Sequence, residues 1–135
     1  KIWNMARFIS MNQTQSSNFK AQNLEELLGI AKNKKDKEMI EKVQKLTKEI
    51  TKNLEEYNFN YAAEGLYDFI WHEFADNYIE DVKNRIDENS YLILNHLYLI
   101  LLKLLHPFMP FVTEEIYQRF GFGKSIMVDK WPSYA

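Results

Sequence analysis

The opening residues of the chain carry side chains that can contact a nucleic acid. Arg7 can donate two parallel hydrogen bonds to a phosphate or a base edge, and Asn4 can read a base edge. An exposed Trp3 or Phe8 can stack on an unpaired base. Most aromatic side chains at helical spacing pack in a core, however, so these residues alone favour packing and solvated charge over binding.

No residue pattern in the chain is typical of catalysis or metal binding. The sequence has no glycine-rich phosphate loop, no His-Glu-x-x-His pair and no Gly-x-Ser-x-Gly turn. Its three histidines, His72, His96 and His106, are widely separated, and it has no cysteine to supply a thiolate. We therefore expect no catalytic residue, no metal site and no cofactor within these 135 residues.

Length and composition favour one helical domain over residues 1–135. With 46% hydrophobic residues but only 4 glycines and 3 prolines, the chain has few turn formers, which favours a small number of long elements. The lack of cysteine is compatible with the cytoplasm. The chain begins with Lys1 and shows no signal peptide, so we expect a fragment of a longer protein.

The net charge of −2 conceals two unlike halves. Residues 1–53 carry 11 Lys or Arg and 6 Asp or Glu, which gives 11 − 6 = +5. Residues 54–135 carry 6 and 13, which gives 6 − 13 = −7. A basic half permits one surface that faces a polyanion, although on charge alone a solvated, lysine-rich helix is the favoured interpretation.

Apolar residues recur at the helical period along most of the chain. The almost continuously apolar stretch 91–105 predicts a central, buried helix, which is too short for a membrane span and contains Lys103. Ser90 can cap that helix, and Pro110 suits the first turn of a last helix that stops at Gly121. The other expected helices cover residues 1–12, 23–31, 36–57 and 60–87, with a loop at 13–18 and a basic connector at 32–35.

The faces of the longest predicted helix, residues 60–87, follow from its charges. Acidic residues and one histidine repeat every fourth position and should form its wet face; they are Glu64, Asp68, His72, Asp76 and Glu80. The apolar arc on the other faces, which Tyr67 and Trp71 should widen, needs at least two neighbouring helices to cover it. Polar and apolar residues alternate weakly over 125–128, which predicts an extended segment. The expected fold class is therefore an all-α helical bundle with a short extended C-terminal tail.

Four stretches of the chain, in order, resemble one protein family. They are residues 1–12, 58–63 with 66–80, 104–117, and 125–128 with 131–132, and together they cover roughly half of the sequence. The run Leu104 to Tyr117, with His-Pro-Phe-Met-Pro-Phe at 106–111, resembles the last-helix signature of class I aminoacyl-tRNA synthetases for branched aliphatic amino acids, in the form most like the valine enzymes. The stretch 28–37 departs from the family, because it is lysine-rich and lacks the tryptophan of an Asp-Arg-Trp-like segment.

The resemblance implies the anticodon-binding domain of a larger, cytoplasmic synthetase. Its partners would be the anticodon stem-loop of a tRNA and the rest of the synthetase chain, with no membrane. The parent enzyme would attach valine to its tRNA with ATP and Mg²⁺ at a site outside this fragment. Residues expected to contact the tRNA lie on the first helix and on the basic connector; they are Lys1, Asn4, Arg7, Asn12, Lys32, Lys34 and Lys35.

Two alternatives remain open from the sequence. The same domain of an isoleucyl- or leucyl-tRNA synthetase would share the fold and read another anticodon. A helical protein-interaction module would instead bind a protein and ignore RNA. Salt separates the last alternative from the others, since phosphate contacts weaken steeply as salt rises.

Overall fold

The computed structural model describes residues 2–11, 24–85 and 87–132, and every element within them is helical. The helices are α1 (Ile2–Met11), α2 (Leu24–Ile30), α3 (Lys34–Glu55), α4 (Phe59–Asp68), the π-helix η1 (Phe69–Ile79), α5 (Glu80–Lys83), α6 (Glu88–Leu105), α7 (Pro110–Arg119) and the 3₁₀ turn η2 (Ile126–Val128). The predicted all-α bundle is confirmed. The predicted loop at 13–18 lies outside the described residues.

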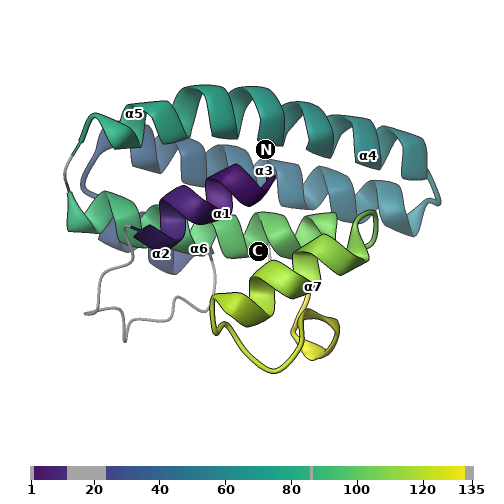
Figure 1. The fold of residues 1–135 in the computed structure, drawn as a ribbon. Helices are drawn as coiled ribbons and strands as arrows, with labels where there is room; N and C mark the ends of the chain where they lie inside the picture. Colours follow the sequence, from purple (N-terminus) through teal and green to yellow (C-terminus); the bar gives the residue numbers. More distant parts are fainter. Residues whose placement is uncertain (1, 12–23, 86, 133–135) are drawn as a thin grey trace.

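The long elements of the bundle are α3, the α4–η1–α5 run and α6, and the shorter helices α1, α2 and α7 pack against them (Figure 1). The chain runs along α3, turns back, and returns through α4, η1 and α5 as one continuous rod beside it. Helix α6 packs against α3 and also contacts α7 and α1. The short helix α1 crosses the front of α6 in Figure 1.

Helix α6 is the centre of the core, as its apolar sequence predicts. Leu97 and Leu101 are almost completely buried, and the helix buries residues around most of its circumference because it has neighbours on several sides. The predicted cap is wrong. Asp87 caps α6, since its side chain accepts a hydrogen bond from the backbone N–H of Asn89 at 3.0 Å, whereas Ser90 is fully buried in a polar cluster.

The long rod that precedes α6 contains eleven residues of π-helix, which periodicity did not predict. Its predicted wet face is confirmed, because all five residues of that line are exposed. The prediction that Tyr67 widens the buried arc is wrong. Tyr67 is 52% exposed and stacks on the half-buried Trp71, with ring centroids 4.0 Å apart.

Both ends of the last helix follow from local chemistry. Pro110 occupies the first turn of α7 as predicted, and Gly121 takes a φ of 70° just beyond the helix, a conformation that glycine adopts without steric cost. The predicted extended tail is wrong, because residues 126–128 form a 3₁₀ turn. That turn is fixed by Ser125, whose hydroxyl accepts from the N–H of Met127, and by the Glu114 carboxylate, which accepts from the N–H of Ile126 at 2.7 Å.

Candidate nucleic-acid interface

The outer strip of α1, which we define as Trp3, Asn4, Arg7 and Ser10, is exposed to solvent. The opposite face of the helix is buried, through Ile2, Met5, Ala6 and Ile9. Trp3 and Arg7 are four residues apart, so their side chains leave the same face of the helix about one turn from each other. The structure therefore presents Asn4 and Arg7 on an accessible surface. Lys1 and Asn12, the other two sites predicted on this helix, lie outside the described residues.

Helix α1 is anchored at both ends. The hydroxyl of buried Tyr98, in α6, donates a hydrogen bond to the carbonyl of Ile2 at 2.9 Å. At the other end Phe8 packs edge-on against Tyr91, with ring centroids 6.5 Å apart, and the Lys83 ammonium lies 5.2 Å from the Phe8 ring centroid. Phe8 is therefore a packing residue, and of the two candidate stacking aromatics only Trp3, at 44% exposure, is largely accessible.

The predicted basic connector is shorter than residues 32–35. Asn33 is the N-cap of α3, and its side chain accepts from the backbone N–H of Lys35 at 2.8 Å, so Lys34 and Lys35 belong to the first turn of the helix. Asparagine is a strong N-cap residue, which is the signal that could have set this boundary. Residues 31 to 33 link α2 to α3, so only residues 32 and 33 of the predicted connector lie outside a helix. The amide of Asn89 holds this link, since it donates to the carbonyl of Ile30 at 3.0 Å and accepts from the N–H of Lys32 at 3.4 Å.

The side chains of Lys32, Lys34 and Lys35 are all exposed, but they differ in electrostatic surroundings. Lys35 donates to the carboxylate of Asp81 at 3.0 Å. Over the part of the chain that the structure describes, no carboxylate lies within ion-pair distance of Lys32 or Lys34. A helix N-terminus favours anions, so Lys34 gains nothing from the helix dipole and is better suited to an external phosphate.

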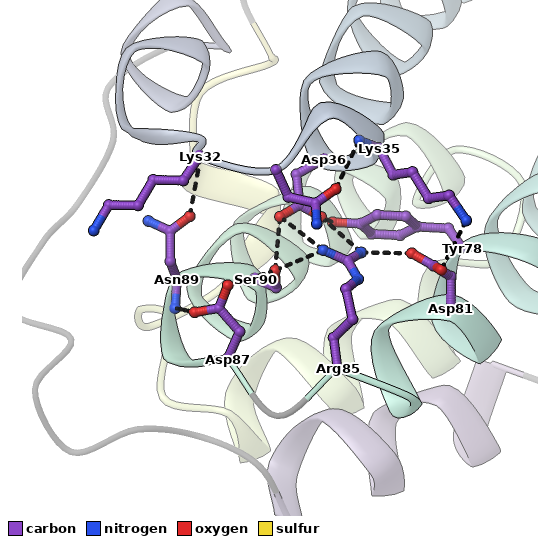
Figure 2. A network of polar contacts seen from close by, with 10 residues as sticks. Lys32, Lys35, Asp36, Tyr78, Asp81, Arg85, Asp87, Asn89 and Ser90 are labelled. Atoms are coloured by element: carbon purple, nitrogen blue, oxygen red, sulfur yellow. Dashed lines mark hydrogen bonds and ion pairs between the residues drawn. The ribbon is translucent and has the colours of Figure 1, made fainter.

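A buried polar cluster lies directly beneath the connector (Figure 2). The carboxylate of Asp36, fully buried in the first turn of α3, accepts hydrogen bonds from Tyr78 at 2.8 Å, from Ser90 at 2.7 Å and from the Arg85 guanidinium at 3.1 Å. Arg85 also pairs with Asp81 at 2.7 Å. The cluster joins the start of α3 to η1, to α5 and to the start of α6, and so fixes where the connector lies.

The charges of this cluster are settled by its contacts. Burial raises the pKa of the Tyr78 hydroxyl far above its ordinary range, and the adjacent Asp36 carboxylate raises it further. Tyr78 is therefore a permanent hydrogen-bond donor to Asp36. Partial burial opposes the charge on Asp81, but the hydrogen bond from Lys35 and the charge of Arg85 outweigh it and hold the pKa of Asp81 below its usual value.

The structure brings α1 and the connector to the same end of the bundle. Phe8 contacts Lys83 and Tyr91, while Lys35 and Lys32 contact Asp81 and Asn89, so both elements meet the turn between α5 and α6. In Figure 1 this end also holds α2. Sequence reasoning missed Lys83, which no motif singles out, and Arg119, whose guanidinium carbon lies 5.4 Å from the Trp3 ring centroid.

The rod formed by α4, η1 and α5 is acidic. A hollow of about 510 Å³ lies between α3 and the α4–η1 rod, and Glu49, Asp68 and Glu73 are among the residues that line it. Between residues 59 and 83 the chain carries six carboxylates and one lysine. Two of these six carboxylates lie near the connector, since Asp81 pairs with Lys35 and Glu80 pairs with Lys83. The candidate interface therefore rests on the exposed polar strip of α1 and on Lys32 and Lys34, for which the described residues hold no ion-pair partner.

Two further observations concern the described residues alone. They contain no group of three or more His, Cys, Asp or Glu side chains that could hold a metal ion. None of the helices described combines the length and the apolar character that crossing a membrane requires.

The chain is a helical bundle that presents Arg7, Lys32 and Lys34 to solvent. The sequence model of the family described as the anticodon-binding domain of tRNA ligase matches residues 36–135, and the chain belongs to that family. The match begins at Asp36, so α1 and the connector lysines precede it.

The relatives of the chain point to one kind of ligase. It is 40% identical over 137 residues to a valine–tRNA ligase of Thermotoga maritima, and 42% identical over 137 residues to one of Pseudothermotoga lettingae; each alignment covers 98% of this chain and 15% of the relative. A valine–tRNA ligase of Clostridium acetobutylicum is 40% identical over 142 residues, with 99% of this chain and 16% of the relative covered. These alignments include α1 and the connector. They confirm the resemblance to the valine enzymes, and the chain spans about 15% of the length of these relatives.

Proposed function

We propose that the chain binds the anticodon stem-loop of the valine tRNA, as one domain of a longer valine–tRNA ligase. Its family and its similarity to valine–tRNA ligases support this function over the same domain of an isoleucine or leucine enzyme. A module that binds protein and ignores RNA is the weaker alternative, because the chain belongs to a family of anticodon-binding domains.

The observation that carries the proposal is the outer strip of α1. Arg7 is exposed, and no carboxylate lies within ion-pair distance of it among the described residues. The backbone beneath it is held by Tyr98 and by the packing of Phe8. A planar guanidinium on a rigid helix suits base edges in an unpaired loop, where Watson–Crick edges are accessible. Asn4 on the same strip, together with the predicted Lys1 and Asn12, would complete the base-reading set.

The connector would supply the contacts to the RNA backbone. Lys32 and Lys34 carry exposed ammonium groups at the α2–α3 junction, and Lys35 is the third member of the predicted set. Backbone contacts position an RNA without reading its sequence, whereas base contacts specify it. We therefore assign recognition of the loop bases to α1 and contacts with the RNA backbone to the connector.

The chemistry of aminoacylation would take place elsewhere in the longer protein, which we expect to work in the cytoplasm. The parent enzyme would use ATP and Mg²⁺ to activate valine. This chain supplies no glycine-rich phosphate loop, and the described residues hold no metal-binding cluster, so we derive no step of that reaction from them. The 135 residues would act as a single domain that sets the distance between anticodon and active site.

Binding of two RNA hairpins tests the proposal. One hairpin carries a valine anticodon loop and the other a mismatched loop on the same stem. A base-reading arginine contributes about 1–3 kcal/mol of discrimination, so Arg7→Ala should narrow the preference for the valine loop by that amount. The measurement is the ratio of the two dissociation constants at two salt concentrations.

The matched control changes Lys34 and Lys35 together to Ala. Both hairpins should then bind more weakly, with their ratio unaltered, because phosphate contacts do not distinguish loops. If the ratio of the two dissociation constants were unchanged in Arg7→Ala, α1 would serve packing and not recognition of the loop. Binding of both hairpins that did not respond to salt would contradict the function as a whole.

A further inference from the structure

Trp3 and Arg119 come from opposite ends of the sequence and meet on the surface. The Arg119 guanidinium carbon, at the last residue of α7, lies 5.4 Å from the centroid of the Trp3 ring. Trp3 is 44% exposed, although the residues beside it on α1 that face the core are buried. A large apolar ring is therefore kept partly in water, with a planar cation over it.

The Arg119 side chain is held in place from its own helix. Its Nε donates to the carboxylate of Glu115, one turn earlier on α7, at 2.7 Å. The guanidinium side chain is 67% exposed despite this ion pair. The pair of residues thus offers two accessible planar groups, an indole and a guanidinium, each held to a helix that packs on α6.

We propose that Trp3 and Arg119 form a stacking site for one unpaired base of an RNA loop. Unpaired bases stack on aromatic rings and on arginine planes, and such stacking tolerates any base because every base has a π-face. The site deepens the proposed function and rests on it. It adds to the outer strip of α1 a position that binds a loop nucleotide without reading its sequence.

The location of the pair matches this role. Arg7 lies one helical turn from Trp3 on the same face of α1, so a base stacked on the indole would leave the next part of the RNA within reach of the Arg7 guanidinium. The stacking site lies at the start of α1, whereas Phe8 and the connector lie toward its other end. An RNA loop held at Trp3 would therefore run along α1 toward the lysines.

Tryptophan fluorescence tests the stacking site directly. The chain has three tryptophans, so the double variant Trp71→Phe, Trp131→Phe leaves Trp3 as the sole reporter. This variant is titrated with the valine-anticodon hairpin and, as a control, with a fully paired RNA duplex of equal charge. The hairpin should quench Trp3 emission and the duplex should not, because only an unpaired base can stack on the ring.

Affinity provides the second readout. Stacking is worth about 1–3 kcal/mol per base, so Trp3→Leu should weaken hairpin binding about 5- to 150-fold and leave duplex binding unchanged. Arg119→Lys keeps the positive charge but removes the planar guanidinium, so it should also weaken binding of the hairpin. Each variant's midpoint of urea unfolding is measured alongside.

The outcomes separate this site from the function on which it rests. Hairpin binding that discriminates anticodons but leaves Trp3 emission and the Trp3→Leu affinity unchanged overturns the stacking site alone. Equal losses for hairpin and duplex in both Trp3→Leu and Arg119→Lys, with lower unfolding midpoints, make the pair a structural contact and also overturn it. If the valine-anticodon hairpin binds no better than the duplex, the proposed function fails and the stacking site fails with it.

Discussion

Asp36 shows how one buried charge can be stable in this bundle. Its carboxylate is fully buried, but it accepts hydrogen bonds from Tyr78, Ser90 and Arg85, and the last supplies the compensating charge. Arg85 is itself shared with Asp81. A charge taken out of water is tolerated only when it is paired and its oxygens are satisfied. The cluster thus locks the start of α3, and with it the connector lysines, to α5 and α6.

Replacement of Asp36 should be costly. Asp36→Ala leaves Arg85 without its buried partner, and breaking such a pair costs about 3–5 kcal/mol, with the lower end expected because Asp81 still contacts Arg85. Asp76→Ala is the matched control, since its pair with His72 spans 3.8 Å between exposed side chains and should be worth less than about 1 kcal/mol. Urea unfolding measures both free energies. Equal costs for the two variants would contradict the structural role of the cluster.

At the scale of the helices, α6 carries most of the packing. Leu101 is 1% exposed and lies at the centre of the bundle, so Leu101→Ala should destabilise the protein by about 2–5 kcal/mol. Glu64→Ala, on the wet face of α4, should be nearly neutral. Chemical denaturation ranks the two variants. A larger effect for Glu64→Ala would mean that the faces of these helices are assigned the wrong way round.

The C-terminal turn should be sensitive to acid through Glu114. Hydrogen bonds from the Ser125 hydroxyl and the Ile126 N–H to its carboxylate lower the pKa of Glu114 below its usual value. A lowered pKa means that the carboxylate stabilises the fold fully above the unfolded pKa of about 4.3, and that this contribution is lost as the pH falls through the folded pKa.

The Ile126 amide proton reports this transition. Its NMR chemical shift should titrate with a midpoint below about pH 4.3 in the unaltered chain and should lose that transition in Glu114→Gln, which keeps an acceptor oxygen but cannot titrate. A midpoint at or above the ordinary value for glutamate would show that the carboxylate does not hold η2.

The helices were predictable from sequence because their apolar period was clear, but their irregularities were not. Leu66, Ile70, Phe74, Tyr78 and Val82 are spaced strictly by four, and all are buried. An α-helix turns about 100° per residue, so such a stripe would drift by about 40° at each step. The wider turns of a π-helix reverse that drift and keep the stripe on the core. A spacing of four also fits an ordinary α-helical stripe over short stretches, so the sequence predicts a regular helix there and does not predict η1.

Other features depend on contacts between distant residues, which periodicity does not contain. Ser90 has the chemistry of a helix cap, but Asp36 lies 54 positions away in the chain and draws its hydroxyl into the buried cluster. The Trp3–Arg119 pair likewise joins residues far apart in the sequence, from α1 and α7, two helices that both contact α6. The accessible residues of the candidate site, by contrast, were predictable, because Asn4 and Arg7 lie off the stripe of Ile2, Met5, Ala6 and Ile9.

At the scale of the whole molecule, charge is divided between neighbouring helices. The lysine-rich first half supplies α1, the connector and α3, while the acidic second half supplies the α4–α5 rod. A uniform net charge of −2 would disfavour RNA, but cations without an ion-pair partner, such as Lys32 and Lys34 among the described residues, can still attract a phosphate backbone locally. The overall charge is therefore a poor guide to the binding of this chain, and the charges at the connector matter more.

The dependence of RNA binding on salt should resolve the connector lysines one by one. Lys34→Ala should lower the slope of log affinity against log salt by about one, as expected for a lost phosphate contact. Lys35→Ala should lower it less, because the ion pair with Asp81 at 3.0 Å already neutralises part of that charge. Asp81→Asn should release Lys35 and steepen the slope. The measurement is hairpin binding to each variant across a salt series, with urea unfolding as the control for the contact between Asp81 and Arg85. Identical slopes for Lys34→Ala and Lys35→Ala would show that Asp81 yields Lys35 to the RNA, and that the ion pair seen in the free protein does not persist in the complex.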